Sequence, residues 1–327
     1  MERRQMERHQ VWFYLVGILA GLRVGSTAPA LAPTFETALW PALGVLLYAT
    51  FTQVALTRLP EAFRDRRFMS AVLTGNFLIM PVVVWGLLAF LPREPAIRLG
   101  VLLVLLVPCT DWFITFSHLS GGDTHRAIVL TPVNLLVQIA LLPLYLWLFT
   151  GETFSDILAA GRIVRVFVAL IVLPLLAAWL TERWAEHRTE RAGLVGRLGW
   201  LPVPLLTLVV FLLAASQVHT VFGALPVLGH VLGVFLGFLV AAAVIGTATA
   251  RLFALPPAAS RTLMFSFGTR NSFVVLPLAL ALPAPWQAAA VVIVFQSLVE
   301  LFGMVAYLWV VPRLLARDVS RPGRAGE

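Results

Sequence analysis

The chain has 327 residues, of which 60% are hydrophobic and only 12% are charged, and its mean hydropathy is +0.91. Soluble domains carry about 25% charged residues, so this composition excludes them and indicates an all-α polytopic membrane protein. Because Cys109 is the single cysteine, the chain can form neither an intrachain disulfide nor a C-x-x-C metal site, and we expect no cofactor.

The formal net charge of +8 comes from arginine alone, because the sequence contains no lysine. A basic balance could indicate nucleic acid as a partner. However, the arginines are spread over the predicted loops and form no basic amphipathic segment. We therefore expect no nucleic acid partner, and interpret the arginines as signals of orientation in the lipid bilayer.

Apolar segments follow one another along the chain at the spacing that membrane helices of about 20 residues require. We predict ten spans, at about 11–25, 36–57, 68–91, 96 through the run 108–123, 124–149, 162–181, 200–217, 225–249, 261–282 and 286–311. The first could instead be a signal peptide, because small residues follow it.

Two of the ten spans are interrupted by polar residues. The fourth contains Pro108, Cys109 and Asp111, and the ninth contains the polar run 267–272. In a bilayer, a broken helix is tolerated only where it faces protein or a water-filled cavity. Broken helices at corresponding positions of two halves are the sequence mark of a carrier's binding site.

Ten spans divide into two halves, 1–150 and 151–327. Five spans per half would invert the second half relative to the first, which is the plan of many secondary carriers. In the fifth span of each half, two polar residues lie four positions apart and so share one helix face: Asn134 with Gln138, and Gln296 with Glu300.

Ten spans also place both termini on one side. With the amino terminus inside, eighteen arginines fall in inner regions and four in outer ones, namely Arg93, Arg98, Arg162 and Arg165. The excess of inner positive charge predicts that both termini, including the short tail, are cytoplasmic. In a bacterial-type cell this would be the plasma (inner) membrane.

The charged residues within the spans are the candidate functional groups. We expect Asp111 and Arg270 to meet and form an ion pair, because inverted halves would bring the two breaks together. Such a pair could be an architectural lock, a substrate site or both. A carboxyl group in an apolar environment favours its neutral form, so Glu300 could carry a proton, or could simply hydrogen-bond across a helix interface.

Cys109 is either a small buried hydrophobe or a ligand beside the helix break. The next half-helix would point its positive end toward the cavity and favour a thiolate or an anion. We expect His118 and His125 to be structural, and Asp123 to cap the fifth span.

Cys109 and the run Gly121-Gly122-Asp123 that follows it resemble the signature of the Acr3 family of arsenite permeases, which is part of the bile acid:sodium symporter superfamily. The resemblance continues through both halves and is best at about 103–149. It includes these further residues: Asn134, Gln138, Tyr145, Trp147, Asn271, Phe273, Leu298, Val299 and Glu300.

This resemblance implies a panel domain and a core domain, the core holding two crossed, broken helices. It implies that Cys109 is a transient metalloid ligand. It also makes Glu300 the counterpart of the family's glutamate in span ten. Two departures concern the coupling ion: Asp111 and Arg270 stand where small or amide residues are usual, and Val274 replaces an acid. A fixed guanidinium at this position disfavours sodium coupling and, by elimination, favours protons or uniport.

The sequence therefore predicts a secondary transporter that exports arsenite, or a related metalloid oxyacid, in exchange for protons. We expect the substrate to contact the first break (Cys109, Thr110, Asp111), the second break (Arg270, Asn271) and the polar face of the fifth span (Asn134, Gln138), and Glu300 and Asp111 to couple protons. An alternative is a sodium- or proton-coupled symporter of an organic anion, steered by Arg270. A third hypothesis is an intramembrane enzyme with Asp111 and Glu300 as its acids, which inverted repeats disfavour.

Overall fold

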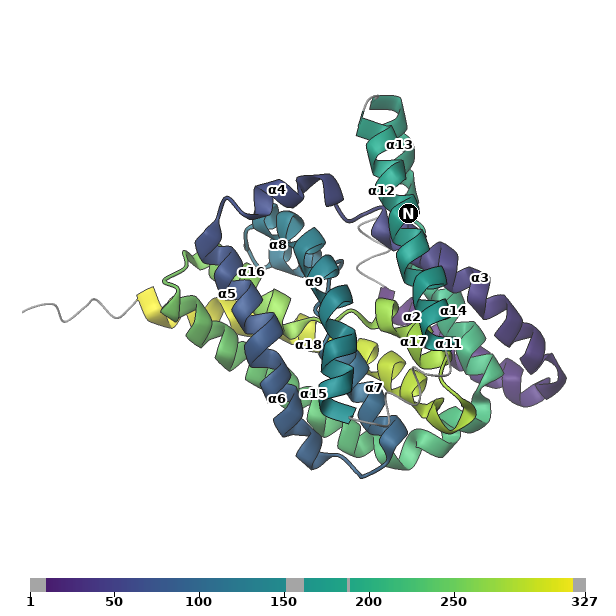
Figure 1. The fold of residues 1–327 in the computed structure, drawn as a ribbon. Helices are drawn as coiled ribbons and strands as arrows, with labels where there is room; N and C mark the ends of the chain where they lie inside the picture. Colours follow the sequence, from purple (N-terminus) through teal and green to yellow (C-terminus); the bar gives the residue numbers. More distant parts are fainter. Residues whose placement is uncertain (1–9, 151–161, 187–188, 320–327) are drawn as a thin grey trace, which may run out of the picture.

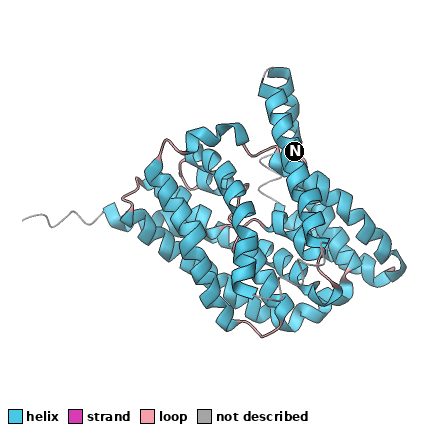
Figure 2. Cartoon of the chain, viewed as in Figure 1, coloured by secondary structure: helices cyan, strands magenta, loops and turns pink. Residues whose placement is uncertain are grey.

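A computed structural model describes residues 10–150, 162–186 and 189–319, and within these ranges every regular element is a helix (Figure 2). The α-helices are α2 (Gln10–Thr27), α3 (Ala32–Phe51), α4 (Leu59–Ala62), α5 (Arg66–Thr74), α6 (Met80–Leu87), α7 (Pro95–Leu105), α8 (Phe113–Leu119), α9 (Thr124–Thr150), α11 (Arg162–Phe167), α12 (Leu173–Glu186), α13 (Thr189–Leu198), α14 (Pro202–Ser216), α15 (Val218–Leu252), α16 (Pro257–Gly268), α17 (Ser272–Leu280) and α18 (Ala288–Val319).

Shorter elements connect or extend these helices. The 3-10 turns are η1 (Pro29–Leu31), η2 (Leu56–Arg58), η4 (Leu88–Phe90) and η6 (Ala284–Trp286), and the π-helical turns are η3 (Gly75–Ile79) and η5 (Val168–Val172). Because η3 joins α5 to α6, and η5 joins α11 to α12, each of these pairs forms one longer helix.

Seven helical stretches of the described chain are long and apolar enough to cross a membrane: Pro29–Phe51, Arg66–Phe90, Thr124–Phe149, Val164–Glu186, Gly193–Ser216, Val218–Leu252 and Ala284–Leu315. The chain is thus a multi-pass, all-helical membrane protein. The first apolar helix and the two interrupted segments are too short, taken piece by piece, to be counted with them. The number ten for the spans remains a prediction.

The helices form two groups that lie side by side in Figure 1. In one, which we call the outer bundle, α14 packs against α2 and α3, and α12 packs against α3. In the other, the crossing bundle, α18 packs against α7, α15, α16 and α17, while α8 lies against α9 and α16. Helix α18 is therefore the central element of the crossing bundle.

Prolines within the spans explain several of its side-chain contacts. Pro81 has no N–H to bond the carbonyl of Phe77, four residues earlier, and the chain widens into the π-turn η3 just before it. The hydroxyl of Tyr145 donates to that carbonyl instead. In the same way, Thr131 Oγ1 donates at 2.8 Å to Ile128 O, the carbonyl that Pro132 leaves without a helical donor.

Two glycines let helices approach closely beside the breaks. A Cβ on Gly75 would lie 1.7 Å from Cζ of Phe267, and one on Gly268 would lie 2.6 Å from Cε2 of Tyr307. Since real Cβ atoms do not come this near to other heavy atoms, a side chain at either position would push the ring away. These glycines therefore bring η3 and α18 against the end of α16, where the second break begins.

Some sequence-based expectations fall outside the described residues. The charged amino-terminal segment 1–9, the boundary between the halves at 150/151 and the tail after 319 belong to this group. Asp123 does cap α9 as expected, because its Oδ1 accepts from Arg126 N at 3.0 Å.

Candidate functional site

The two interrupted segments meet, and their backbones are hydrogen-bonded to each other. Between α7 and α8 and between α16 and α17, the helix is interrupted for a few residues, and Pro108 and Arg270 form an isolated antiparallel bridge. Cys109 N donates to Thr269 O at 3.1 Å, and Asn271 N donates to Val107 O at 2.8 Å. We call this place the crossing. It satisfies inside the protein the backbone groups that the helix breaks expose.

Side chains reinforce the crossing. Asn271 Nδ2 donates to Thr110 Oγ1 at 2.9 Å, and Asn271 Oδ1 caps α17 by accepting from Val274 N at 3.4 Å. Cys109 is buried, with 3% of its surface exposed, and its sulfur accepts from Asp111 N at 3.4 Å. The structure therefore brings Cys109, Thr110 and Asn271 together.

Glu300 enters the crossing from α18 and accepts three hydrogen bonds. Trp112 Nε1 donates to Oε1 at 2.9 Å, while Arg270 N and Gln296 Nε2 donate to Oε2 at 2.8 and 2.6 Å. Gln296 Oε1 in turn accepts from Ser272 Oγ at 2.8 Å. An acceptor-only group suits such a set of donors, so the contacts fit the ionised carboxylate. One carboxylate thus holds both breaks to α18.

The guanidinium of Arg270 is buried, with 1% of the residue exposed. Its Nη2 donates to Phe267 O at 2.6 Å and to Asn76 Oδ1 at 3.3 Å, and its Cζ lies 4.8 Å from the ring centre of Phe238. Its Nε and Nη1 have no hydrogen-bond partner among the described residues. The charge is therefore held by a carbonyl, an amide and an aromatic face.

The expected ion pair of Asp111 with Arg270 is not what the structure shows. Both residues lie at the crossing, but the guanidinium hydrogen-bonds to Phe267 and Asn76, and its backbone N–H goes to Glu300. The physical reason is the orientation of the Arg270 side chain: its guanidinium points back along α16 toward η3 and α15. The carboxylate that contacts Arg270 is that of Glu300, which accepts from the backbone N–H of Arg270, whereas the backbone N–H of Asp111 donates to the sulfur of Cys109.

Asn134 and Gln138 lie one turn apart on α9 and are both buried, with 0% and 1% of their surfaces exposed. Neither oxygen nor nitrogen of either side-chain amide has a hydrogen-bond partner within the described parts of the chain. The structure thus keeps the predicted polar face of this helix inside the protein but pairs it with nothing. Buried amide groups are normally hydrogen-bonded, so this pair requires an explanation.

Equivalent contacts recur at a constant interval along the chain. Tyr145 donates to Phe77 O and Tyr307 donates to Leu239 O, and both bonds span 68 residues. The two tyrosines are 162 positions apart in the numbering, as are the bridged residues Pro108 and Arg270. The same interval relates Asn134 to Gln296, Gln138 to Glu300, and the prolines that begin α7 and α16.

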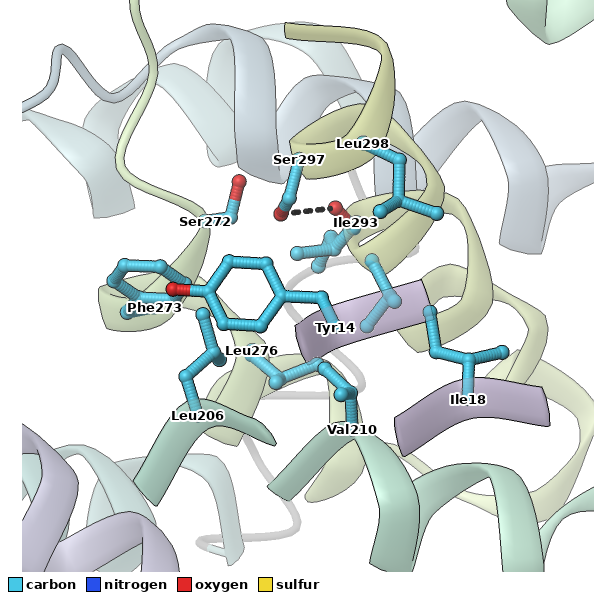
Figure 3. A pocket seen from close by; sticks show the side chains of 11 residues that line it. Tyr14, Ile18, Leu206, Val210, Ser272, Phe273, Leu276, Ile293, Ser297 and Leu298 are labelled. Atoms are coloured by element: carbon cyan, nitrogen blue, oxygen red, sulfur yellow. Dashed lines mark hydrogen bonds between the residues drawn. The ribbon is translucent and has the colours of Figure 1, made fainter. Parts of the chain in front are cut away.

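A small cavity lies next to the crossing, between the two bundles (Figure 3). Its lining includes Tyr14 from α2, Leu206 from α14 and Ser272 from the start of α17. Its volume is about 10 Å³, which is space for about one water molecule. This cavity is therefore too small to hold a solute larger than water.

The sequence reasoning missed several residues of the site. Trp112 and Asn76 were not singled out, although a tryptophan within the polar run and an asparagine in an apolar span were visible signals. Phe238, which stacks on Arg270, carries no such signal, because it is one of many phenylalanines in apolar spans.

A second charged group lies where α5 and α9 begin; we call Asp65, Asp123 and Arg126 the Arg126 cluster. Arg126 Nε donates to Asp65 Oδ2 at 2.8 Å, and Nη1 forms an ion pair with Asp123. Burial raises the pKa of the Asp65 carboxyl, but the Phe68 N–H and the Arg126 guanidinium outweigh this and lower the pKa below its usual value. This cluster therefore ties the two helix starts together.

Within the described ranges, no group of three or more His, Cys, Asp or Glu side chains could hold a metal ion. Cys109 is the only sulfur donor that a cysteine could supply. A thiophilic substrate would thus meet one sulfur.

Comparison with known proteins identifies a family model and several proteins that are similar to this chain. A sequence model of the Sodium Bile acid symporter family matches residues 40–248. The Arsenical-resistance protein Acr3 of Corynebacterium glutamicum is 23% identical over 337 residues, covering 95% of this chain and 86% of the relative. A protein of the same name from Alkaliphilus metalliredigens is 22% identical over 197 residues, with 54% of this chain and 55% of the relative covered. The uncharacterized sodium-dependent transporter YocS of Bacillus subtilis is 20% identical over 182 residues, with 56% and 54% covered.

Proposed function

Because the chain belongs to the sodium bile acid symporter family, we propose that it is a secondary transporter that exports arsenite, or a related metalloid oxyacid, in exchange for protons. The relatives named Arsenical-resistance protein Acr3, one of which aligns over most of both chains, support this cargo. The observation that carries the proposal is the position of Cys109: the one sulfur that trivalent arsenic could bind lies buried at the crossing of two broken helices.

Cys109 would bind the substrate transiently. Its thiol would exchange with one hydroxyl of arsenous acid, so that a sulfur–arsenic bond forms, an arsenic–oxygen bond breaks and water leaves. Hydrolysis by water would reverse this step on the other side of the membrane. One chain offers one thiol, so the substrate is never trapped by several sulfurs, and a carrier needs its substrate to leave again.

Glu300 would couple this cycle to protons, with Asp111 at the same crossing as a second acid. Protonating Glu300 would place a hydrogen on an oxygen that now accepts one or two N–H groups, so at least one of its three hydrogen bonds would weaken. Those bonds join α18 to both breaks. Proton uptake would therefore loosen the crossing itself, which provides a physical link between a proton and helix movement.

The recurring interval of 162 residues supports the repeat architecture that transport requires. We propose ten spans as two inverted five-helix repeats, 1–150 and 151–327, with the broken α7–α8 and α16–α17 as their fourth members. The uneven distribution of arginines favours cytoplasmic termini in the plasma membrane. The alternating states would then arise by movement of the outer bundle against the crossing bundle.

One observation favours a second candidate, a sodium- or proton-coupled symporter of an organic anion. The Nε and Nη1 groups of Arg270 have no hydrogen-bond partner among the described residues, and could bind a carboxylate if the crossing opened. YocS, a relative, is named as a sodium-dependent transporter. Against sodium in this chain is the fixed positive charge of Arg270, which would repel a second cation nearby.

Transport into everted membrane vesicles tests the proposal. We expect arsenite uptake that is driven by a pH gradient, is indifferent to a sodium gradient and is lost in Cys109→Ala. Thr37→Ala, which removes one exposed hydroxyl from the outer face of α3, is the control and should transport normally. Arsenite uptake unchanged in Cys109→Ala would remove the arsenite proposal. Thermal stabilisation by a small carboxylate that is lost in Arg270→Ala but kept in Cys109→Ala would establish the second candidate.

A further inference from the structure

The unpaired amides of Asn134 and Gln138 identify a ligand site in the first half of the chain. All four polar atoms of these two amides are buried and without a hydrogen-bond partner within the described ranges. Leaving a buried polar atom unpaired destabilises the folded protein. Four on one helix face indicate that a molecule other than the protein supplies the partners.

Comparison with α18 explains why the protein does not supply them. Glu300 receives the backbone N–H of Arg270 and the indole N–H of Trp112. The residues 162 positions away from these donors are Pro108, which has no N–H, and Val274, which has no polar side chain. Both donors are therefore missing around Gln138.

The hydroxyl that corresponds to the partner of Gln296 makes no hydrogen bond to Asn134 in the described chain. On α18, Gln296 accepts from the hydroxyl of Ser272. The counterpart of Ser272 at the same interval is Thr110, whose hydroxyl oxygen instead accepts from Asn271 across the crossing. The α18 face is thus complete, while the α9 face has lost each of the equivalent bonds.

The chemistry of the four atoms selects the class of ligand. A cation would satisfy the two carbonyl oxygens and leave two NH2 groups unpaired, whereas an anion would satisfy the NH2 groups and leave the oxygens unpaired. A hydroxyl group both donates and accepts. We propose that Asn134 and Gln138 bind a small uncharged molecule with several hydroxyl groups, such as arsenous acid or boric acid.

This inference rests on the proposed function, because the four atoms are enclosed and a ligand reaches them only when the surrounding helices separate. It adds selectivity to that function: the amide face binds the hydroxyl groups, and Cys109 adds a bond only to a thiophilic centre. Boric acid, which has hydroxyl groups but no affinity for sulfur, therefore isolates the amide face from the thiol.

The test measures thermal unfolding of the purified full-length protein in detergent with boric acid, sodium chloride or sodium formate. We expect boric acid at neutral pH to raise the unfolding temperature, and the effect to disappear at alkaline pH where borate forms. Sodium and formate should have no specific effect. Cys109→Ala should keep the response to boric acid.

Two variants separate this site from general packing. Gln138→Leu should raise the unfolding temperature of the free protein, because it removes two unpaired buried atoms, and should abolish the response to boric acid. Thr50→Val is the matched control. Thr50 Oγ1 in α3 is also buried and has no hydrogen-bond partner among the residues that the structure describes, so this variant should be stabilised as well but keep the response.

A specific shift with sodium or formate that is lost in Gln138→Leu would overturn the proposal in favour of a charged ligand. An unchanged response to boric acid in Gln138→Leu, or no response in the wild-type protein, would also overturn it. These results would leave the transport proposal standing as long as vesicles still accumulate arsenite through Cys109. Conversely, a vesicle assay that shows no arsenite transport would not alter binding of boric acid.

Discussion

The crossing and the Arg126 cluster both hold charged side chains, but they do so with different partners. In the Arg126 cluster, an arginine lies between two carboxylates, and the side chains are 25–38% exposed. At the crossing, Glu300 and Arg270 are almost fully buried, and their side chains bond to backbone groups, an indole, amides and an aromatic ring. The exposed charges are paired directly, whereas the buried ones are each solvated by neutral dipoles.

The difference follows from the surroundings. Water screens the Arg126 cluster and competes with its ion pairs, so each pair contributes little to stability. Inside the bilayer water does not compete, and a buried charge requires several fixed dipoles to replace its hydration. The crossing supplies these dipoles from the helix breaks themselves. Breaking the helices therefore creates the groups that stabilise the buried carboxylate.

The largest effect is expected for Glu300→Leu. This substitution leaves the N–H groups of Trp112, Arg270 and Gln296 without their acceptor and removes the carboxylate that joins them. Losing one partner of a buried charged network costs about 3–5 kcal/mol. Denaturant unfolding in detergent micelles measures this directly. A loss below about 0.5 kcal/mol, the range of ordinary surface changes, would show that the crossing does not depend on Glu300.

Trp112→Phe tests one of the three donors in isolation. The phenylalanine ring should keep the edge contact with Phe273, whose ring centre lies 5.6 Å from that of Trp112, while the hydrogen bond to Glu300 is lost. A hydrogen bond to a charged group contributes about 1.5–3 kcal/mol, so we expect a destabilisation in that range. The double variant Trp112→Phe/Glu300→Leu should be no less stable than Glu300→Leu, and additive losses would contradict a direct bond.

Arginine-to-lysine exchanges compare the two regions most directly. In Arg270→Lys the charge stays, but the planar group over Phe238 and the bond to either Phe267 or Asn76 are lost, which should cost about 1–2 kcal/mol. In Arg126→Lys one ion pair can re-form in water, so the loss should stay below about 1 kcal/mol. Equal losses in the two variants would show that the crossing and the Arg126 cluster depend on their arginines to the same extent.

The sequence could predict the class of the fold and the meeting of the two interrupted segments. High hydropathy, the interrupted spans and the polar pairs on the fifth spans all follow from which residues can lie in a bilayer. Cys109, Thr110 and Asn271 are indeed adjacent in the structure. These predictions succeeded because polar residues within apolar segments must face other protein groups or a cavity instead of lipid.

The orientation of the Arg270 side chain could not be predicted from the sequence. The ion pair of Asp111 with Arg270 was inferred from opposite charges at two meeting breaks, but the guanidinium turns toward Asn76, Phe267 and Phe238. A long side chain can reach either side of the backbone, and only the packing around it decides which. The π-turn at η3 and the close approach at Gly75, which shape the space around Arg270, arise from contacts between distant segments.

The smallest effect is expected at the Arg126 cluster, in Asp65→Asn. Asparagine can keep the cap on α5, where Asp65 Oδ1 accepts from Phe68 N at 3.0 Å, but it loses the charge that Arg126 contacts. At neutral pH the loss should stay below about 1 kcal/mol.

Because the pKa of Asp65 is lowered in the folded protein, its charge stabilises the fold above the unfolded pKa of about 3.9, and this contribution is lost as the pH falls through the folded pKa. Unfolding temperatures measured from neutral to acidic pH should therefore show a gap between wild type and Asp65→Asn that closes below about pH 4. A gap that persists undiminished in acid would mean that the Asp65 carboxylate does not act through its charge, and that the two regions differ less than their exposure indicates.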